Sequence, residues 1–361
     1  MTRQTMKLTE VRGPIRNVLG LCAALSVALA MARPARADGT ELRIASLAPS
    51  GSPWMEVLDK AASEIKDKTS GRVSLKYFEG GQQGDERDFV RKIKLGQLDG
   101  AAVTAVGLSM IDKSIRVLEL PMMFQSAEEL DYVADKLWPY FQKKFEKRGF
   151  RLNDRGEVGW IYFLSKNKIE KLSDLQGQKL WLWGDDQLVG AIYKKLGLSG
   201  IPLGVPEVDG NLTSGKIDAC YGSPLAAVAL QWYSKVKYMT SMPMSFALGA
   251  TVVSVDAYKK LSPEDAKVVD EIGRANAKKL RKVIRKSNED AKGTMIRKGV
   301  TIVQTPIAMV DEFTKKSTEI WNELAGKMYS KEELKMVLDA RDEYRAKHKT
   351  AELPPPSAAS K

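Results

Sequence analysis

Residues 174–183 read DLQGQKLWLW, and residues 207–224 read EVDGNLTSGKIDACYGSP. The first segment predicts a strand that ends in aromatic residues. The second predicts a strand that ends at Tyr221, Gly222 and Ser223. An apolar pattern typical of an amphipathic helix lies between them. Neither segment carries a set of catalytic side chains, so we interpret both as strand ends that point side chains into a cleft.

Two further segments precede this stretch, GGQQGDERDFVRKIKLGQLDGAAV at residues 80–103 and ELPMMFQSAEEL at residues 119–130. The ordered set of motifs resembles the periplasmic solute receptors of tripartite ATP-independent periplasmic (TRAP) transporters, of the DctP type, over roughly residues 40 to 330. The resemblance implies an α/β, bilobal fold that is periplasmic-binding-protein-like (type II-like). In such a fold, two α/β lobes enclose a ligand and a long helix spans both.

One position departs from the resembled pattern. The family usually has an arginine two residues after the lysine of this strand, where it pairs with the carboxylate of the ligand. Here Lys179 is followed by Leu180 and Trp181. The expected fold is unaffected by this change. The ligand expected from it is apolar, aromatic or cationic rather than a small dicarboxylate, because an indole stands where the guanidinium usually stands.

The first 37 residues have the pattern of a cleavable signal peptide. Basic residues precede the apolar run at 17–32, and Ala35-Arg36-Ala37 is a small-x-small cleavage site. Leu21 before Cys22 is too bulky for a lipoprotein signal, so we expect a soluble mature protein in the periplasm that begins near Asp38, without stable membrane insertion. Residues 1–37 hold six Lys or Arg and one acid, so removing them lowers the net charge from +12 to about +7.

The remaining positive charge is spread along helices in mixtures of lysine and glutamate, which favours a solvated surface over a nucleic-acid site. Cys220 is the one cysteine after residue 37. An intrachain disulfide is therefore excluded for the mature chain, and we expect a buried, unreactive thiol.

The chain of 361 residues is long enough for two lobes. A strand-helix alternation from Leu42 to Val106 predicts parallel strands with ligand binding at their carboxyl ends. Ser126 is expected to cap a helix through about Lys147, with Trp138-Pro139 inside that span as a candidate break. Two separate strands are expected at 150–154 and 160–164.

The segment Ser262-Pro263-Glu264-Asp265 predicts the start of a long helix that reaches Lys298. We divide the chain into a signal peptide, the first part of lobe I, lobe II, a return to lobe I, and a disordered tail that includes His348. These parts are residues 1–37, 38–160, 161–249, 250–347 and 348–361.

The sequence shows no recognisable combination of side chains for catalysis. His348 is the only histidine, which removes Ser–His and Cys–His pairs and most zinc sites. Asp185 and Asp186 precede a helix, where Asp186 is expected to act as an N-cap rather than as part of a catalytic pair. The sequence therefore predicts neither an enzyme nor a cofactor.

Aromatic and polar residues at helix starts, strand ends and the Gly-rich loop are the predicted ligand contacts. Trp181 and Tyr221 form the main contact surface in this hypothesis, with the full set Trp54, Gln83, Trp160, Trp181, Trp183, Tyr221 and Ser223.

The leading interpretation is a periplasmic receptor that closes two lobes around a small molecule and delivers it to the membrane permease subunits of a TRAP transporter. Three alternatives stay open. They are a receptor for an organic acid that uses another cation, such as Arg155 or Lys179, an envelope adaptor or sensor without transport function, and an exported enzyme of the same fold.

Overall fold

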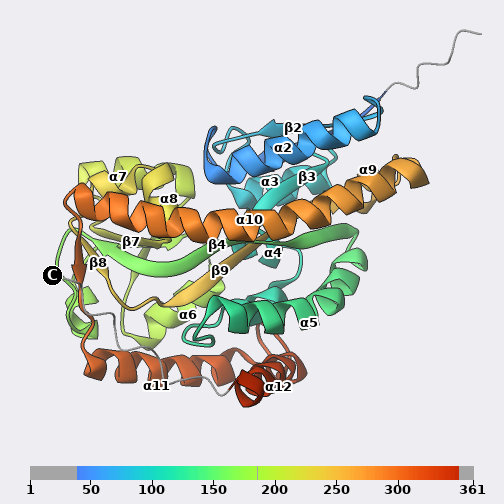
Figure 1. The fold of residues 1–361 in the computed structure, drawn as a ribbon. Helices are drawn as coiled ribbons and strands as arrows, with labels where there is room; N and C mark the ends of the chain where they lie inside the picture. Colours follow the sequence, from blue (N-terminus) through green and yellow to red (C-terminus); the bar gives the residue numbers. More distant parts are fainter. Residues whose placement is uncertain (1–38, 185, 349–361) are drawn as a thin grey trace, which may run out of the picture. The chain divides into compact units, whose positions relative to one another are not determined.

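The computed structural model describes residues 39–184 and 186–348. The first half of this region alternates strands and helices, as the sequence predicts (Figure 1). Its elements are β1 (Thr40–Ser46), α2 (Pro53–Lys68), β2 (Val73–Phe78), α3 (Glu86–Lys94), β3 (Gly100–Thr104), α4 (Ala105–Ser109), η1 (Lys113–Glu119), α5 (Ala127–Glu146), β4 (Phe150–Ser165), η2 (Leu172–Leu175), β5 (Leu180–Trp183), α6 (Gln187–Lys195) and β6 (Gly200–Leu203).

The second half returns to the sheet and ends in long helices. Its elements are η3 (Val205–Glu207), α7 (Val208–Ser214), β7 (Ala219–Gly222), α8 (Pro224–Ala229), η4 (Trp232–Ser234), β8 (Tyr238–Thr240), β9 (Ser245–Ser254), α9 (Val255–Tyr258), α10 (Pro263–Arg297), β10 (Thr301–Val303), α11 (Ile307–Leu324) and α12 (Lys331–His348).

The strands are ordered β2-β1-β3-β9-β4-β7-β5-β6, and β8 joins β4 to β10. β1 pairs in parallel with β2 and β3, as expected, whereas β9 runs antiparallel to β3 and β4. The long strand β4 changes partner along its length. Residues up to Ile161 pair with β9, and residues from Tyr162 pair with β7. β4 thus connects an N-terminal strand group (β2, β1, β3, β9 and its own first part) to a central strand group (its last part, β7, β5, β6, β8 and β10).

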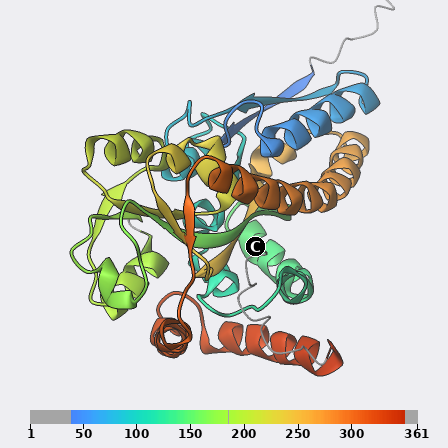
Figure 2. The same cartoon turned by 60° about the vertical axis from the view of Figure 1, so that its left-hand side comes forward.

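Helix α10 is the long helix that the sequence predicts, with Ser262 as N-cap and Pro263 in its first turn. It packs against α2, β4 and α8, so it contacts elements of both strand groups. Figures 1 and 2 show α2 and α10 on one side of the strands and α11 and α12 on the other. Within the described residues, no helix is long and apolar enough to cross a membrane.

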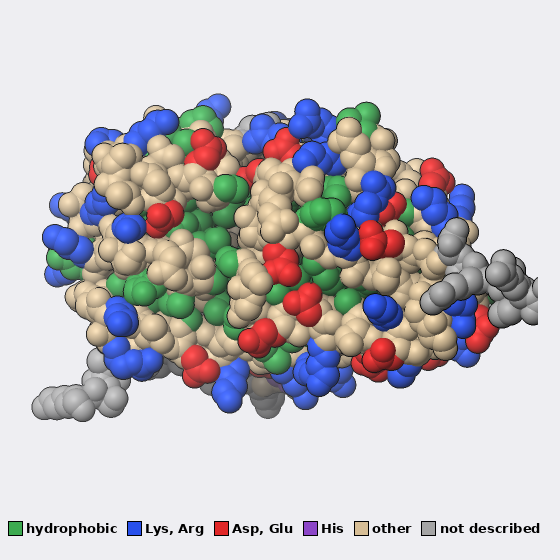
Figure 3. All heavy atoms as spheres, turned by 90° about the horizontal axis from the view of Figure 1, so that it is seen from above, with side chains coloured by type: hydrophobic (Ala, Val, Ile, Leu, Met, Phe, Trp, Pro, Cys, Tyr) green, Lys and Arg blue, Asp and Glu red, His purple; other side chains and the backbone are tan. Residues whose placement is uncertain are grey.

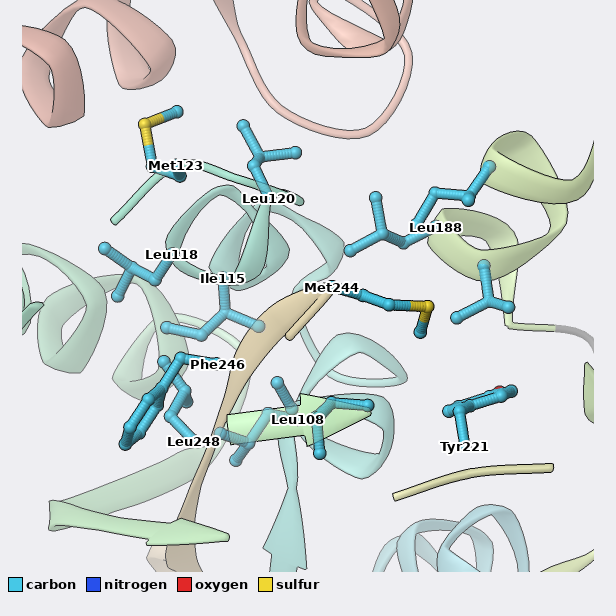
Figure 4. Packing of buried hydrophobic residues seen from close by; sticks show 14 of the residues in the cluster. Leu108, Ile115, Leu118, Leu120, Met123, Leu188, Tyr221, Met244, Phe246 and Leu248 are labelled. Atoms are coloured by element: carbon cyan, nitrogen blue, oxygen red, sulfur yellow. The ribbon is translucent and has the colours of Figure 1, made fainter. Parts of the chain in front are cut away.

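A large hydrophobic cluster extends through both strand groups and the helices beneath them. Figure 4 shows part of it around Met244, with side chains that come from η1, α6, β7 and β9. A second, smaller cluster lies among α2, α9, α10 and the strands β1, β2 and β9, and includes Ile44, Ile65 and Val269. The cavity described below extends into this second cluster.

Several local predictions are confirmed. The side chains of Ser126 and Asp186 accept hydrogen bonds from backbone amides at the starts of α5 and α6, as expected. Ser52 and Ser223 do the same at the starts of α2 and α8. Cys220 is buried, and burial raises the pKa of its thiol. The caps form because side-chain oxygens satisfy the first backbone amides of each helix.

Other predictions were wrong. β4 is one strand, because the expected break at 155–159 consists of two bulges whose charged residues, Arg155 and Glu157, are buried in ion pairs. α5 continues through Pro139, since its apolar face packs against β4 and α12. The strands β6 and β8 were not predicted.

His348 ends α12 and stacks on Tyr344, so it does not belong to a disordered tail. The rest of that tail, residues 349–361, lies outside the described residues, as do the signal peptide at 1–37 and Cys22.

Candidate functional site

A cavity of about 290 Å³ lies where the two strand groups and α10 meet. Its wall is mostly apolar and is contributed by α2, β1, β3, β4, β5, α6, β7, α8, β9 and α10. Trp54, Trp181, Trp183, Tyr221 and Ser223 lie on this wall, so the fold brings together five of the seven residues predicted to contact a ligand.

The aromatic side chains at the ends of β5 and β7 form a stack. The Trp181 ring lies 4.7 Å from the Tyr221 ring and 5.9 Å from the Trp183 ring, both nearly parallel, and it meets Trp232 edge-on at 5.4 Å. The indole N–H of Trp181 donates to the carbonyl of Leu203 at 3.0 Å. Trp181 is only 1% exposed, so it shapes the cavity wall while offering little free surface.

Tyr221 and Trp183 present more of their surface than Trp181 does. Tyr221 is 8% exposed and Trp183 is half-buried. The Tyr221 hydroxyl accepts a hydrogen bond from the Trp183 backbone N–H at 3.1 Å, and burial raises the pKa of the phenol well above its usual range. The phenol therefore stays neutral and can donate its proton to a ligand.

Trp54 and Ser223 approach the cavity from helix starts. The Trp54 indole donates to the carbonyl of Glu157 at 3.1 Å, which fixes the start of α2 against β4. Ser223 is fully buried, and its hydroxyl oxygen accepts from the amide of Ala226 at the start of α8. Each side chain thus combines a structural contact with a place on the cavity wall.

The other two predicted residues lie elsewhere. The carbonyl and the side-chain oxygen of Gln83 both accept from Lys92, which ties the Gly-rich loop to α3. Trp160 packs edge-on against Phe246 at 5.0 Å. Among the described residues that line the cavity, neither is present.

Sequence reasoning missed a buried ionic group on the cavity wall. Arg116 of η1 donates to Asp186 at 3.0 Å, and its Nε lies 3.3 Å from Glu119. Nε is buried and has no hydrogen-bond partner within the described part of the chain. Burial raises the pKa of Glu119 to about 7, although Arg116 opposes this shift. The available signal was an arginine inside the apolar run SIRVL at 114–118.

Carboxylates outnumber cations on the wall. Glu86 accepts from Thr104 and from the amide of Gly107, and burial raises its pKa to about 8. Glu157 is held by Arg285 of α10 at 2.8 Å. The two cations considered from sequence lie off the wall formed by the described residues. Arg155 is buried among acids on α5 and β4, and Lys179 donates to Gly215 at an exposed position.

Asp85 connects the N-terminal strand group to the central one. Its carboxylate accepts from the Trp183 indole at 3.0 Å and from the Val205 amide at 2.8 Å. It also accepts from the amide of Glu86, as the N-cap of α3. One side chain therefore starts a helix on one side of the cavity and contacts β5 and η3 on the other.

The site has the properties of a binding cavity. Among the described residues, no group of three or more His, Cys, Asp or Glu side chains is arranged to hold a metal ion. On the wall, Glu86 and Glu119 accept from backbone amides, and Asp186 and Glu157 pair with arginines. Apolar walls with a few placed polar groups are typical of sites that bind small molecules.

A family model described as "DctP: Bacterial extracellular solute-binding protein, family 7" matches residues 44–328. A solute-binding protein of Chromohalobacter salexigens is 23% identical over 296 residues, which are 81% of this chain and 88% of the relative. The residues matched by the family model include every cavity residue named above.

Solved structures agree on the fold. A TRAP periplasmic solute binding protein from Xanthobacter autotrophicus Py2, with bound β-D-galacturonate, has a TM-score of 0.78 at 20% identity and covers 83% of this chain and 99% of its own. The sugar acid binding protein DctPAm from Advenella mimigardefordensis, in complex with galactonate, has a TM-score of 0.80 at 20% identity, with 85% and 99% covered. The expected bilobal α/β fold is confirmed.

Proposed function

The chain belongs to the DctP family, family 7 of the bacterial extracellular solute-binding proteins, and on that premise we propose that it is the receptor of a TRAP-type secondary transporter. The receptor captures a small molecule in the cavity between its lobes and delivers it to the permease subunits in the membrane. The observation that carries this proposal is a cavity whose wall comes from both strand groups and from α10. The family is one of binding proteins, so the exported enzyme is set aside.

The receptor works in the periplasm in this proposal. The basic start of the chain, the apolar run at 17–32 and the small-x-small site before Asp38 support export and cleavage. The predicted lobe boundaries, 38–160, 161–249 and 250–347, are also part of the proposal. The change of partner strand on β4 between Ile161 and Tyr162 supports the first of them.

The ligand is apolar, aromatic or cationic. The resemblance puts Trp181 where the family usually has its arginine, and the apolar wall around Trp181 supports the proposal. The nearby arginine, Arg116, is already balanced by Asp186 and Glu119. A dicarboxylate would therefore bring two more negative charges to a wall on which Arg116 is the one cation among the described lining residues, a penalty of several kcal/mol in a buried site.

The contact roles follow from exposure. Trp183, Tyr221 and Trp54 offer aromatic surface to the ligand, and Ser223 lies beside them. Trp181 is almost fully buried, so its role is to support the rings of Tyr221 and Trp183 in the wall. Gln83 and Trp160 act through the elements that they hold, the Gly-rich loop and the β4–β9 pair.

A second candidate ligand is an organic monocarboxylate held by Arg116. The buried Nε without a hydrogen-bond partner favours it. Protonation of Glu119, whose pKa is about 7, would leave Arg116 paired with Asp186 alone, so that its Nε could donate to one ligand carboxylate. The galacturonate and galactonate bound by the two similar structures are carboxylates, which makes this candidate worth a direct test.

Mass spectrometry of the solute released when gently purified protein is denatured tests the proposal. We expect one small molecule in about equimolar amount. Calorimetry with that molecule should give tight binding to the wild type and weak binding to Trp183→Ala at unchanged melting temperature. A protein that carries no solute and binds no member of a broad solute panel would contradict a receptor function and favour an adaptor.

If the solute is an acid, Arg116→Gln should lose its binding, whereas an apolar or cationic solute should still bind this variant. Melting curves of both proteins show whether Arg116→Gln remains folded. Tight binding of succinate-like acids that is unaffected by Trp183→Ala or Arg116→Gln would exclude both ligand classes proposed for this cavity.

A further inference from the structure

The cavity extends away from the lobe interface, beneath α2 and α10. In this part, which we name the helix arm, the lining residues are Val57, Ala61 and Ile65 of α2, Leu75 and Tyr77 of β2, and Val269, Gly273, Ala277 and Leu280 of α10. The arm enters the second hydrophobic cluster, which otherwise fills the space between these helices and the sheet. Figure 3 views the molecule from the side of α2 and α10, and hydrophobic side chains are visible in the middle of this face.

Small residues create the space in the helix arm. Gly273 and Ala277 lie on the face of α10 that lines the cavity, and Ala61 lies on the neighbouring helix α2, which packs against α10. A Cβ atom built on Gly273 would meet no atom within 4 Å. Glycine inside a helix costs about 1 kcal/mol relative to alanine. Helical stability alone therefore does not explain a glycine at this position, whereas an open cavity wall does.

The arm has the dimensions of an extended molecule. Between Val269 and Leu280 the axis of α10 advances by about 16 Å, and between Val57 and Ile65 that of α2 advances by about 12 Å, at about 1.5 Å per residue. All four of these residues line the cavity. Leu280 approaches Gly156 of β4, so the Leu280 end of this path lies at β4, near Glu157 and Trp54.

Polarity divides the cavity. None of the lining residues on α2, α10, β1 or β2 is charged. Asp154 of β4 is a charged lining residue close to Arg274 and Arg281 of α10, and burial raises its pKa. Arg116, Glu119 and Asp186 line the part near the stacked aromatics. In the arm, the amide nitrogen of Asn276 is used by its own helix, where it donates to Ile272. An arm with so few free polar groups binds water poorly and favours apolar atoms.

We infer that the ligand is an elongated molecule with one polar end, whose apolar body lies in the helix arm while its polar end lies among Arg116, Tyr221 and Ser223. This inference rests on the proposed receptor function and names the shape of its ligand. The body corresponds to an aliphatic chain of roughly eight to ten carbon atoms, judged from the length of the arm along the helices.

Straight-chain compounds of increasing length test the inference by calorimetry. The probes are butanoate, hexanoate and octanoate, with the matching alcohols and amines, so that the three series also identify the polar end. Each methylene that enters the arm should lower the dissociation constant about three- to fourfold in the series whose polar end is accepted. From the four-carbon to the eight-carbon compound, the expected gain is about a hundredfold.

Gly273→Leu fills the arm, and Gly210→Leu is the matched control. Gly210 lies in helix α7 at an exposed position, its Cβ would also meet nothing within 4 Å, and it does not line the cavity. Leucine suits both helices better than glycine does, so both variants should fold, as melting curves will show. Gly273→Leu should lose most of the gain with chain length and keep the affinity for four-carbon compounds, while Gly210→Leu should keep both.

Three results would overturn the inference. The first is a solute from the purified protein that binds tightly but is compact and polar, with no gain from chain length in any series. The second is a gain that Gly273→Leu leaves intact, which would make the arm a packing defect of the core. The third is the absence of any bound solute and of any binding, which removes the receptor function itself and the inference with it.

Discussion

Replacing Asp85 with alanine should weaken closure of the two lobes around a ligand, and this effect can be measured separately from the effect on the stability of the fold. In the structure, the Asp85 carboxylate accepts from the Trp183 indole at 3.0 Å and from the Val205 amide at 2.8 Å, on the far side of the cavity. Hydrogen bonds to a charged group contribute about 1.5 to 3 kcal/mol each. Because Asp85 is half-buried, solvent screening weakens both bonds, and we take about 1 kcal/mol for each, about 2 kcal/mol for the pair.

A loss of about 2 kcal/mol from the closed form should weaken ligand binding roughly 30-fold, because a ligand that binds between the lobes must then supply the closing free energy itself. Asp85 also caps α3, and loss of a cap lowers the free energy of unfolding by about 1 kcal/mol. Calorimetry with the solute recovered from the protein measures the first effect, and chemical denaturation measures the second.

Ser126→Ala is the control, since Ser126 caps α5 through the amide of Glu129 and contacts neither Trp183 nor Val205 in the described structure. It should lose similar stability and no affinity. The reasoning is refuted if Asp85→Ala binds the solute as tightly as the wild type and Ser126→Ala do.

Two further predictions concern stability. Burial raises the pKa of Glu119 to about 7, from about 4.5 in the unfolded chain. The folded state therefore binds this proton more strongly than the unfolded state does. The free energy of unfolding should fall by roughly 3 kcal/mol as the pH rises from about 4.5 to 7. Glu119→Gln should remove this part of the slope in denaturation curves recorded across that range, and equal slopes in both proteins would contradict the assignment. Trp181→Phe keeps a ring in the stack but loses the hydrogen bond to Leu203, so urea titration should show a loss of about 1 to 3 kcal/mol, whereas no loss would mean that the wall does not depend on the indole N–H.

The sequence predicts the fold well where a local signal coincides with a buried pattern. Ser262 and Pro263 mark the start of α10, and the alternation in 73–77 marks β2. The sequence predicts the fold poorly where partners that are distant in the sequence lower the free-energy cost of burying a charged side chain. Arg155 and Glu157 indicate a loop by composition, yet Asp131 and Arg285 compensate their charges inside one strand.

The candidate site shows the same division. Trp181, Trp183 and Tyr221 could be predicted to meet because parallel strands end at the same edge of a sheet. The buried pair of Arg116 with Asp186 could not, because these residues are 70 positions apart and become neighbours only when η1 packs near the start of α6, although Glu119 lies three residues from Arg116 in η1 itself. The helix arm was also inaccessible to prediction, since the open space beside Gly273 depends on the distance between two helices that are far apart in the sequence.

Small-angle scattering of the solute-free mature protein, before and after addition of the recovered solute, tests the central claim most directly. A receptor that closes its lobes around a small molecule should show a smaller radius of gyration when calorimetry confirms one molecule bound. A solute that binds one to one and leaves the radius unchanged would contradict closure of this cavity around its ligand.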